Sequence, residues 1–203
     1  MLRSKKHFIL AGTFLALTGC ASYSASMLTT LPVEESRPLH QNSNVLVSCK
    51  IFSPQDSRTY LGRDLIAEGY IPVQMTIRNN GSDPMYLNPA NFNFAVPPVS
   101  EVANKVHTST TARVMGWGIP GLIIFPLLIP AVYDGIKSNE ANAALDADYL
   151  DKAIKEQIIQ PHSSFNGIVF IPREQAGKSV EVYLVNQRTS EKVLCPLIGS
   201  STR

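Results

Sequence analysis

The sequence predicts a mainly β fold, an antiparallel β-sandwich with an inserted apolar segment and helix. Two groups of short runs, one on each side of the middle of the chain, alternate apolar with polar residues. Such alternation marks strands with one buried face, and several short strands separated by turns are typical of antiparallel sandwiches. A long uncharged stretch and a helical pattern separate the two groups.

The first group of strands covers residues 45–96. Alternation predicts strands over 45–52 and 71–78, and the run NNGSDP at 79–84 predicts the turn that follows. Residues 85–87 read as a short returning strand, and the spacing of the apolar residues in 92–96 predicts another.

The second group lies near the end of the chain. Residues 165–171, 179–186 and 192–197 alternate in the same way and are separated by turn-forming residues. We therefore expect strands from both groups to form one sandwich domain over residues 45–200, with an insertion at about 112–160.

A helix is predicted over residues 134–157, within the insertion. Asp134 is of a type that caps helix N-termini. Asp148 with Lys152, and Asp151 with Lys155, have the i,i+4 order that stabilises a helix. The apolar residues at helical spacing, which we expect to face the sandwich, are Ile136, Ala143, Ala147, Leu150, Ile154 and Ile158. A second interpretation is that the small residues of this segment allow close helix packing in a homo-oligomer.

The start of the chain has three parts. Arg3, Lys5 and Lys6 precede an apolar run over residues 8–17, which is too short to span a bilayer. The run ends in Leu17-Thr18-Gly19-Cys20. These residues resemble the lipobox of bacterial lipoproteins, in which the cysteine receives a lipid and a peptidase cuts before it. The alternative is an ordinary signal peptide with a cysteine near the cut.

The lipobox resemblance implies a processed and anchored protein. Residues 1–19 would be a signal peptide, Cys20 the lipid attachment site that holds the chain on a membrane, and residues 20–44 a flexible tether rich in Ser, Thr, Pro and Asn. Ala21, where an Asp would favour the inner membrane, indicates the outer membrane. The implied location is the cell envelope, facing the periplasm in preference to the outside.

A second resemblance concerns the fold. Residues 77–94 and 161–172, the latter reading PHSSFNGIVFIP, resemble immunoglobulin-like modules of bacterial lipoproteins. This likeness covers about a third of the mature chain, and it implies the sandwich but no activity.

Charge and cysteines restrict the partners and the chemistry. Removal of residues 1–19 leaves 15 basic and 16 acidic residues, so no basic face for nucleic acid is expected. Cys49 and Cys195 remain after lipidation; they either form a disulfide, which an export compartment permits, or are two buried free thiols. Neither has a neighbouring His, so no metal site is predicted.

The feature that most needs explaining is the uncharged segment 114–133, which reads VMGWGIPGLIIFPLLIPAVY. It is long enough to span a membrane, but Pro120, Pro126 and Pro130 oppose one straight helix. Three interpretations remain open: a cap buried on the sandwich, an exposed surface for a partner or a second copy, and a hairpin that dips into the membrane. The residues expected to form such a surface are Trp117, Leu122, Ile123, Ile124, Phe125, Leu127, Leu128 and Ile129.

The sequence contains no recognisable catalytic motif. It has no nucleophile elbow, no phosphate-binding loop and no dinucleotide fingerprint, and no cofactor is predicted. Ser109, Ser163 and Ser164, with His107 or His162, are the only candidates for a hidden hydrolase. We therefore expect a non-enzymatic binding or assembly module that acts through its apolar insertion, with an envelope protein or a second copy as partner. The alternative is a membrane-perturbing or pore-associated lipoprotein.

Overall fold

The computed structural model describes residues 22–33, 44–108 and 128–198, and the side chains of 128–137 and 198 are outside the description. The chain divides into two compact units. One comprises Ser24–His107 and Ala144–Arg203, and contains all the strands. The other comprises Met1–Tyr23 and Thr108–Ala143.

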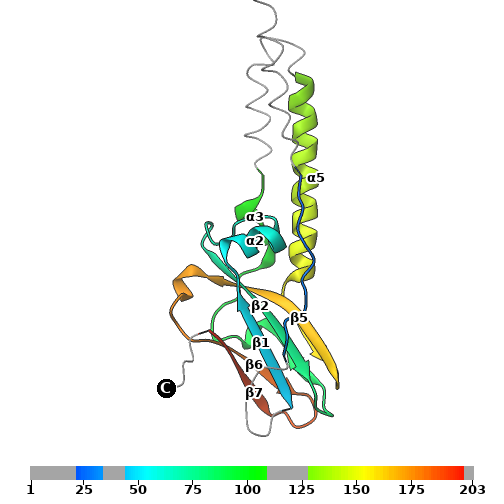
Figure 1. Cartoon of the computed structure of the whole chain (residues 1–203), viewed down its shortest axis with the longest axis vertical. Coiled ribbons are helices and arrows are strands. Elements are labelled where there is room, and N and C mark those ends of the chain that lie inside the picture. The colour runs from blue at the N-terminus through cyan, green and yellow to red at the C-terminus, as the bar shows by residue number, and fades with distance from the viewer. Residues whose placement is uncertain (1–21, 34–43, 109–127, 199–203) are drawn as a thin grey trace, which may run out of the picture. The chain divides into compact units, whose positions relative to one another are not determined.

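The strands form two antiparallel sheets (Figure 1). The three-stranded sheet has the order β1-β2-β5, with β1 at Val45–Ile51, β2 at Tyr70–Asn79 and β5 at Ser163–Pro172. The four-stranded sheet has the order β4-β3-β6-β7, with β4 at Gln157–Ile159, β3 at Met85–Leu87, β6 at Val180–Asn186 and β7 at Lys192–Ile198. Because β1 and β5 flank β2, the first sheet unites both halves of the sequence, as predicted.

The two sheets share one apolar core. Val73, Met75 and Ile77 of β2 contribute from the first sheet, and Val182 and Leu184 of β6 from the second. All five are fully buried. Successive side chains of a strand point to opposite faces. The core therefore takes alternate residues of each strand, which is the pattern that made the strands recognisable in the sequence.

Three α-helices are described: α2 at Pro54–Leu61, α3 at Val99–Val106 and α5 at Leu128–Lys152. Short 3-10 turns lie at Pro89–Asn91 and Arg173–Gln175. α2 begins in a capping box, in which the Ser53 hydroxyl accepts from the Asp56 amide and the Asp56 carboxylate accepts from the Ser53 amide. Neither α2 nor α3 was predicted from the sequence.

The predicted helix is present, but its limits and its buried face are wrong. α5 begins at Leu128, so Asp134 is not its N-cap, and it ends at Lys152. Leu145 and Tyr149 are fully buried, whereas Leu150 is 58% exposed. Ile158 lies in β4 and is exposed. The predicted apolar face included residues of α5 and of β4. The helical spacing of apolar residues has no meaning in a strand, so the predicted face was wrong. The ion pairs Asp148–Lys152 and Asp151–Lys155 are confirmed at 2.7 and 4.0 Å.

Two other predicted elements differ. Residues 92–96 form no strand: Phe92 makes only an isolated bridge to Val182, after a 3-10 turn. The flexible tether predicted over 20–44 does not describe residues 24–33, which belong to the unit that contains the sheets and are bonded to it. Part of that prediction, residues 34–43, lies outside the described residues.

Across the described ranges, no helix combines the length and the apolar character that crossing a membrane would require.

Candidate functional site

The N-terminal segment over residues 24–33, which we call the strap, lies along the β1-β2-β5 sheet and the C-terminal part of α5 (Figure 1). Val33 is its buried side chain, at 4% exposure, whereas Met27 is 87% exposed. The strap is therefore held chiefly by hydrogen bonds to its backbone.

The middle of the strap is bonded to polar side chains on the outer face of the sheet. Gln74 Nε2 donates to the carbonyl oxygen of Thr29 at 2.6 Å, and the Leu31 amide donates to Thr76 Oγ1 at 3.1 Å. Both Gln74 and Thr76 also donate to Asn166 Oδ1, at 2.9 and 3.0 Å. Gln74 and Thr76 are buried although they lie opposite the core face of β2, because the strap covers them.

Further contacts lie on either side. Near the end of the strap, Ser48 Oγ of β1 donates to the carbonyl oxygen of Pro32 at 2.6 Å. Near its beginning, the Ser26 amide donates to the carbonyl oxygen of Thr59 in α2 at 2.8 Å. The strap is therefore bonded over most of its length, from α2 to β1.

Lys152 joins the start of the strap to two helices. Its ammonium group donates to the carbonyl oxygens of Ser26 at 2.9 Å and Tyr60 at 2.7 Å, and to Asp148 Oδ2 at 2.7 Å. An ammonium has three donors, so each has one acceptor. Only 7% of the Lys152 side chain is exposed, and a buried charge requires such partners.

The same stretch of α5 also holds the point where the chain leaves this unit. His107 Nε2, directly after α3, lies 2.6 Å from Asp146 Oδ1. Asp146 and Lys152 are six residues apart in one helix, or about 9 Å along its axis. The chain leaves this unit at three points. Two lead toward residues 108–143, after His107 and before Ala144, and one leads toward residues 1–23, before Ser24. All three points are thus tied to one end of the unit.

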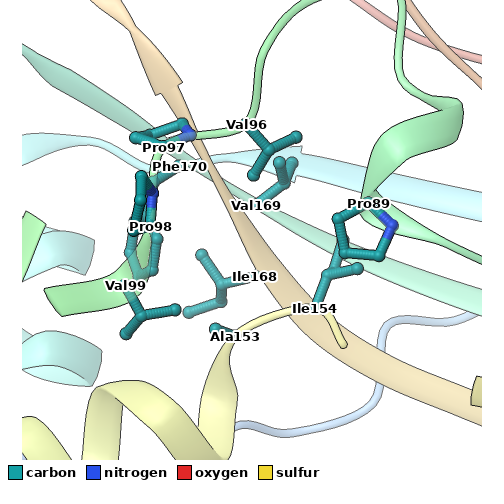
Figure 2. Close-up of a pocket in the computed structure, with 10 residues that line it drawn as sticks. All are labelled: Pro89, Val96, Pro97, Pro98, Val99, Ala153, Ile154, Ile168, Val169 and Phe170. Carbon is teal, nitrogen blue, oxygen red and sulfur yellow. The ribbon is translucent and has the colours of Figure 1, made fainter. Parts of the chain in front are cut away.

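A hollow of about 200 Å³ opens between β5, the residues that follow α5, and the segment before α3 (Figure 2). Ile168 faces it from β5, with Val99 and Ile154 beside it. Every residue that lines it is apolar: Pro89, Val96, Pro97, Pro98, Val99, Ala153, Ile154, Ile168, Val169 and Phe170. With no polar side chain to orient a ligand, it has the character of incomplete packing.

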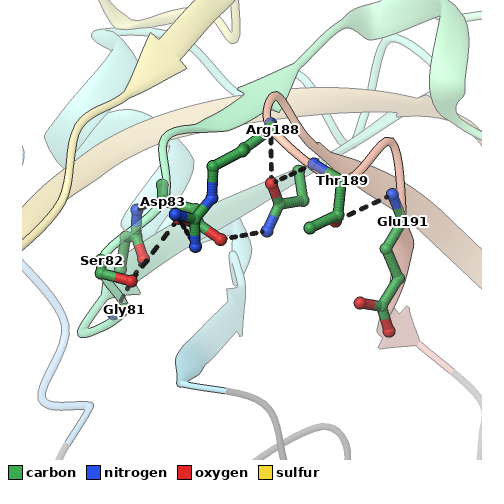
Figure 3. A network of polar contacts seen from close by, with 8 residues as sticks. Gly81, Ser82, Asp83, Arg188, Thr189 and Glu191 are labelled. Carbon is green, nitrogen blue, oxygen red and sulfur yellow. Dashed lines mark hydrogen bonds and ion pairs between the residues drawn. The ribbon is translucent and has the colours of Figure 1, made fainter.

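A polar cluster joins the turn after β2 to the turn after β6 (Figure 3). Asp83 Oδ2 accepts from Asn186 Nδ2 at 3.0 Å, and Asp83 Oδ1 lies 2.7 Å from Arg188. The hydrogen bond from Asn186, followed by the contacts with Arg188, lowers the pKa of Asp83. Asn79, which is buried, donates to the carbonyl oxygens of Asp83, Ile159 and Gln160. The cluster fastens the two turns together and favours the charged form of Asp83.

Cys49 and Cys195 enter the same core from the two sheets, on β1 and β7. Both are free thiols in the structure. Burial raises the pKa of each to about 12, and for Cys195 the proximity of Cys49 adds to this effect. Their pairing in a disulfide stays a prediction.

Most of the other predicted site residues lie outside the residues that the structure describes. Cys20, Ser109, Trp117, and the residues Leu122, Ile123, Ile124, Phe125 and Leu127 all lie there. Leu128 and Ile129 begin α5.

Two of the candidate hydrolase residues that the structure describes contact groups outside the candidate set. Ser163 Oγ donates to the carbonyl oxygen of Gln160, and His107 contacts Asp146. Among the described residues, no three His, Cys, Asp or Glu side chains gather as metal ligands would.

Neither the docking of the strap nor the contacts of Lys152 with it were predicted from the sequence. Leu28, Leu31 and Val33, which are apolar residues inside a polar segment, were the only signal of a docked strap.

Comparison of the chain with protein families, with curated proteins and with solved structures finds no match.

Proposed function

We propose that this chain is an envelope lipoprotein, anchored through Cys20, whose immunoglobulin-like sandwich is a non-enzymatic binding or assembly module. It would act through the apolar segment 114–133, presented to an envelope protein or to a second copy. The observation that carries the proposal is the common departure point: the connections to Cys20 and to the apolar segment are both tied to residues 146–152 of α5.

Chain length makes this departure point significant. Cys20 precedes Ser24 by four residues, which span at most about 14 Å. Residue 114 follows Thr108 by six residues, or at most about 22 Å. A lipid on Cys20 would therefore bring the membrane to the end of the sandwich from which the apolar segment leaves. We infer that the segment meets its partner at the membrane surface.

Burial of apolar surface would supply the driving force. At about 25 cal/mol per Å², a few hundred Å² would contribute several kcal/mol before the cost of ordering is subtracted. We place the protein at the outer membrane, on the periplasmic side, because Ala21 follows the proposed lipid site.

The same observation favours a second candidate, in which segment 114–133 enters the bilayer as a hairpin. Both ends of the segment connect to one end of the sandwich unit, as a hairpin requires. The two candidates differ in what the segment touches, either protein or lipid.

The test compares three acyl-free forms of residues 21–203: the unchanged form, one with Leu122, Ile123, Leu127 and Leu128 changed to Ser, and a control with Ile158→Ser and Tyr183→Ser. The control removes apolar groups that are exposed on the second sheet. Each form is mixed with liposomes and floated on a density gradient. Flotation of the unchanged form and the control, but not of the four-Ser form, would establish the hairpin.

The binding candidate predicts a different result. None of the forms floats, and in native membranes a photo-crosslinker at position 125 of the full chain gives one discrete adduct that the four Ser changes abolish. If the four-Ser form instead loses the thermal unfolding transition of the sandwich, the segment is part of the core and both candidates fail.

A further inference from the structure

We propose that the strap is a releasable tether that sets how far the sandwich stands from the membrane. When docked, it holds the sandwich close to Cys20; when released, it lets the sandwich move tens of ångströms away. This inference rests on the proposed function, because it requires an anchor at Cys20.

The two states differ greatly in length. With the strap docked, only the four steps from Cys20 to Ser24 separate the anchor from the sandwich, at most about 14 Å. With the strap released, the free chain runs over the 13 steps from Cys20 to Val33. That chain reaches about 45 Å when extended, with a root-mean-square length of about 20 Å.

The chemistry of the contact suits reversible release. The strap is bonded through the side chains of Gln74, Thr76, Ser48 and Lys152, and only Val33 is buried as an apolar anchor. On release, water can satisfy each of these polar groups, whereas a strap held by an apolar face would expose that face. Elements with few buried apolar contacts are those that open locally at the lowest free energy.

The contacts are also spread along the strap in a way that resists partial release near the anchor. Ser26 is bonded twice, to Thr59 through its amide and to Lys152 through its carbonyl. A pull on Cys20 would meet this double contact first. We therefore expect the bond between Lys152 and Ser26 to decide whether the strap stays docked on the sandwich.

The experiment uses the full lipidated chain in phospholipid vesicles that contain an acceptor dye on a lipid headgroup. A donor dye is attached to an azide-bearing residue placed at Lys178, which is exposed in the loop before β6. Ser26→Pro with Leu31→Pro removes two amide donors of the strap without altering the sheets. The matched control is Thr30→Pro, in a residue with an exposed side chain between the contacts. Lys152→Met tests the same contact from the other side.

Energy transfer to the membrane should fall about twofold in the double proline variant and in Lys152→Met, and stay unchanged in Thr30→Pro. Limited proteolysis within residues 24–33 should increase in the same two variants. Unchanged transfer alongside increased cleavage would overturn the proposal, and so would a strap that resists cleavage in the double proline variant. Circular dichroism melts identify any variant whose sandwich has unfolded.

Failure of the anchor would be seen separately, because the mass of the N-terminal peptide shows whether Cys20 carries acyl chains. If it carries none, the proposed function loses its anchor. The same transfer measurement then runs on protein coupled through the Cys20 thiol to a maleimide lipid, and it still decides whether the strap controls the distance.

Discussion

The Lys152 ammonium lies 2.9 Å from the carbonyl oxygen of Ser26, a residue 126 positions earlier in the chain. It also donates to Tyr60 and to Asp148, so one buried side chain joins the strap, α2 and α5. This arrangement makes the segment that leads to the proposed lipid anchor a part of the folded unit.

Lys152→Met should destabilise the protein, because it leaves two carbonyl groups and the carboxylate of Asp148 without their shared donor. We expect a loss of about 3 kcal/mol, or a fall in Tm of about 6–12 °C. Lys155→Met is the matched control, because Lys155 is 53% exposed and pairs with Asp151 only at 4.0 Å. It should change stability by less than about 0.5 kcal/mol. Equal Tm values for the two variants would show that the Lys152 contacts contribute nothing.

Asn79→Ala should break the hydrogen bonds that join the turn after β2 to the end of β4. The Asn79 amide donates to three carbonyl oxygens, and its own oxygen accepts from the Gly81 amide at 3.0 Å. Leaving these groups unpaired should cost about 2–3 kcal/mol in a denaturant titration. Asn80→Ala, next to it and exposed, keeps its backbone bond to Asn44 and should be close to neutral. A larger loss in Asn80→Ala would contradict this assignment.

The protein should lose stability in acid as the carboxylates of Asp56 and Asp83 become protonated. Hydrogen bonds from Lys50 and then Ser53 lower the pKa of Asp56 from 3.8 to about 2, and the pKa of Asp83 is lowered by Asn186 and Arg188. A carboxyl with a lowered folded pKa contributes stability above its unfolded pKa, near 4, and loses that contribution as the pH falls toward 2. In Asp56→Asn, the slope of Tm against pH between 4 and 2 should be shallower. An unchanged slope would exclude Asp56 as a contributor.

Cys49 and Cys195 should resist alkylation in the folded protein. Their pKa values are raised to about 12, so almost no reactive thiolate exists at pH 8, and burial restricts access. Iodoacetamide should modify both rapidly in urea and slowly without it. Whole-protein mass spectrometry of the same sample, without a reducing agent, tests the disulfide, which would remove two hydrogen atoms and block alkylation even in urea. Rapid alkylation of the folded protein would contradict the burial of Cys195 and the partial burial of Cys49.

The strands were largely predictable because their signal is local. Met85–Leu87 was predicted with the observed limits, and β1, β2, β5, β6 and β7 were each located to within a few residues. Alternation with a period of two follows directly from burying one face of a strand. β4 was missed because Gln157 was assigned to the preceding helix and Ile158 was counted in the helical pattern.

The helices show where local pattern fails. α2 has a capping box and a proline in its first turn, but it is eight residues long and has a weak apolar face. In α5, burial selects Leu145 and Tyr149, and the aromatic ring of Tyr149 stacks on Phe170 of β5. Because that partner comes from a distant strand, the helical pattern alone could not select this face over the one that includes Leu150.

By itself, the sequence determined the alternating strands, the turns between them, the i,i+4 pairs Asp148–Lys152 and Asp151–Lys155, and the uncharged segment 114–133, because each depends on residues close together in the chain. The tertiary structure alone decided that residues 24–33 dock as a strap, that Gln74 and Thr76 are buried beneath it, and that Lys152 bonds to Ser26 and Tyr60. Ser, Thr and Pro in a short segment look the same in a free tether and in a docked strap. The difference lies in the acceptors and donors that the folded sheet and helices bring to them from 16 to 126 residues away.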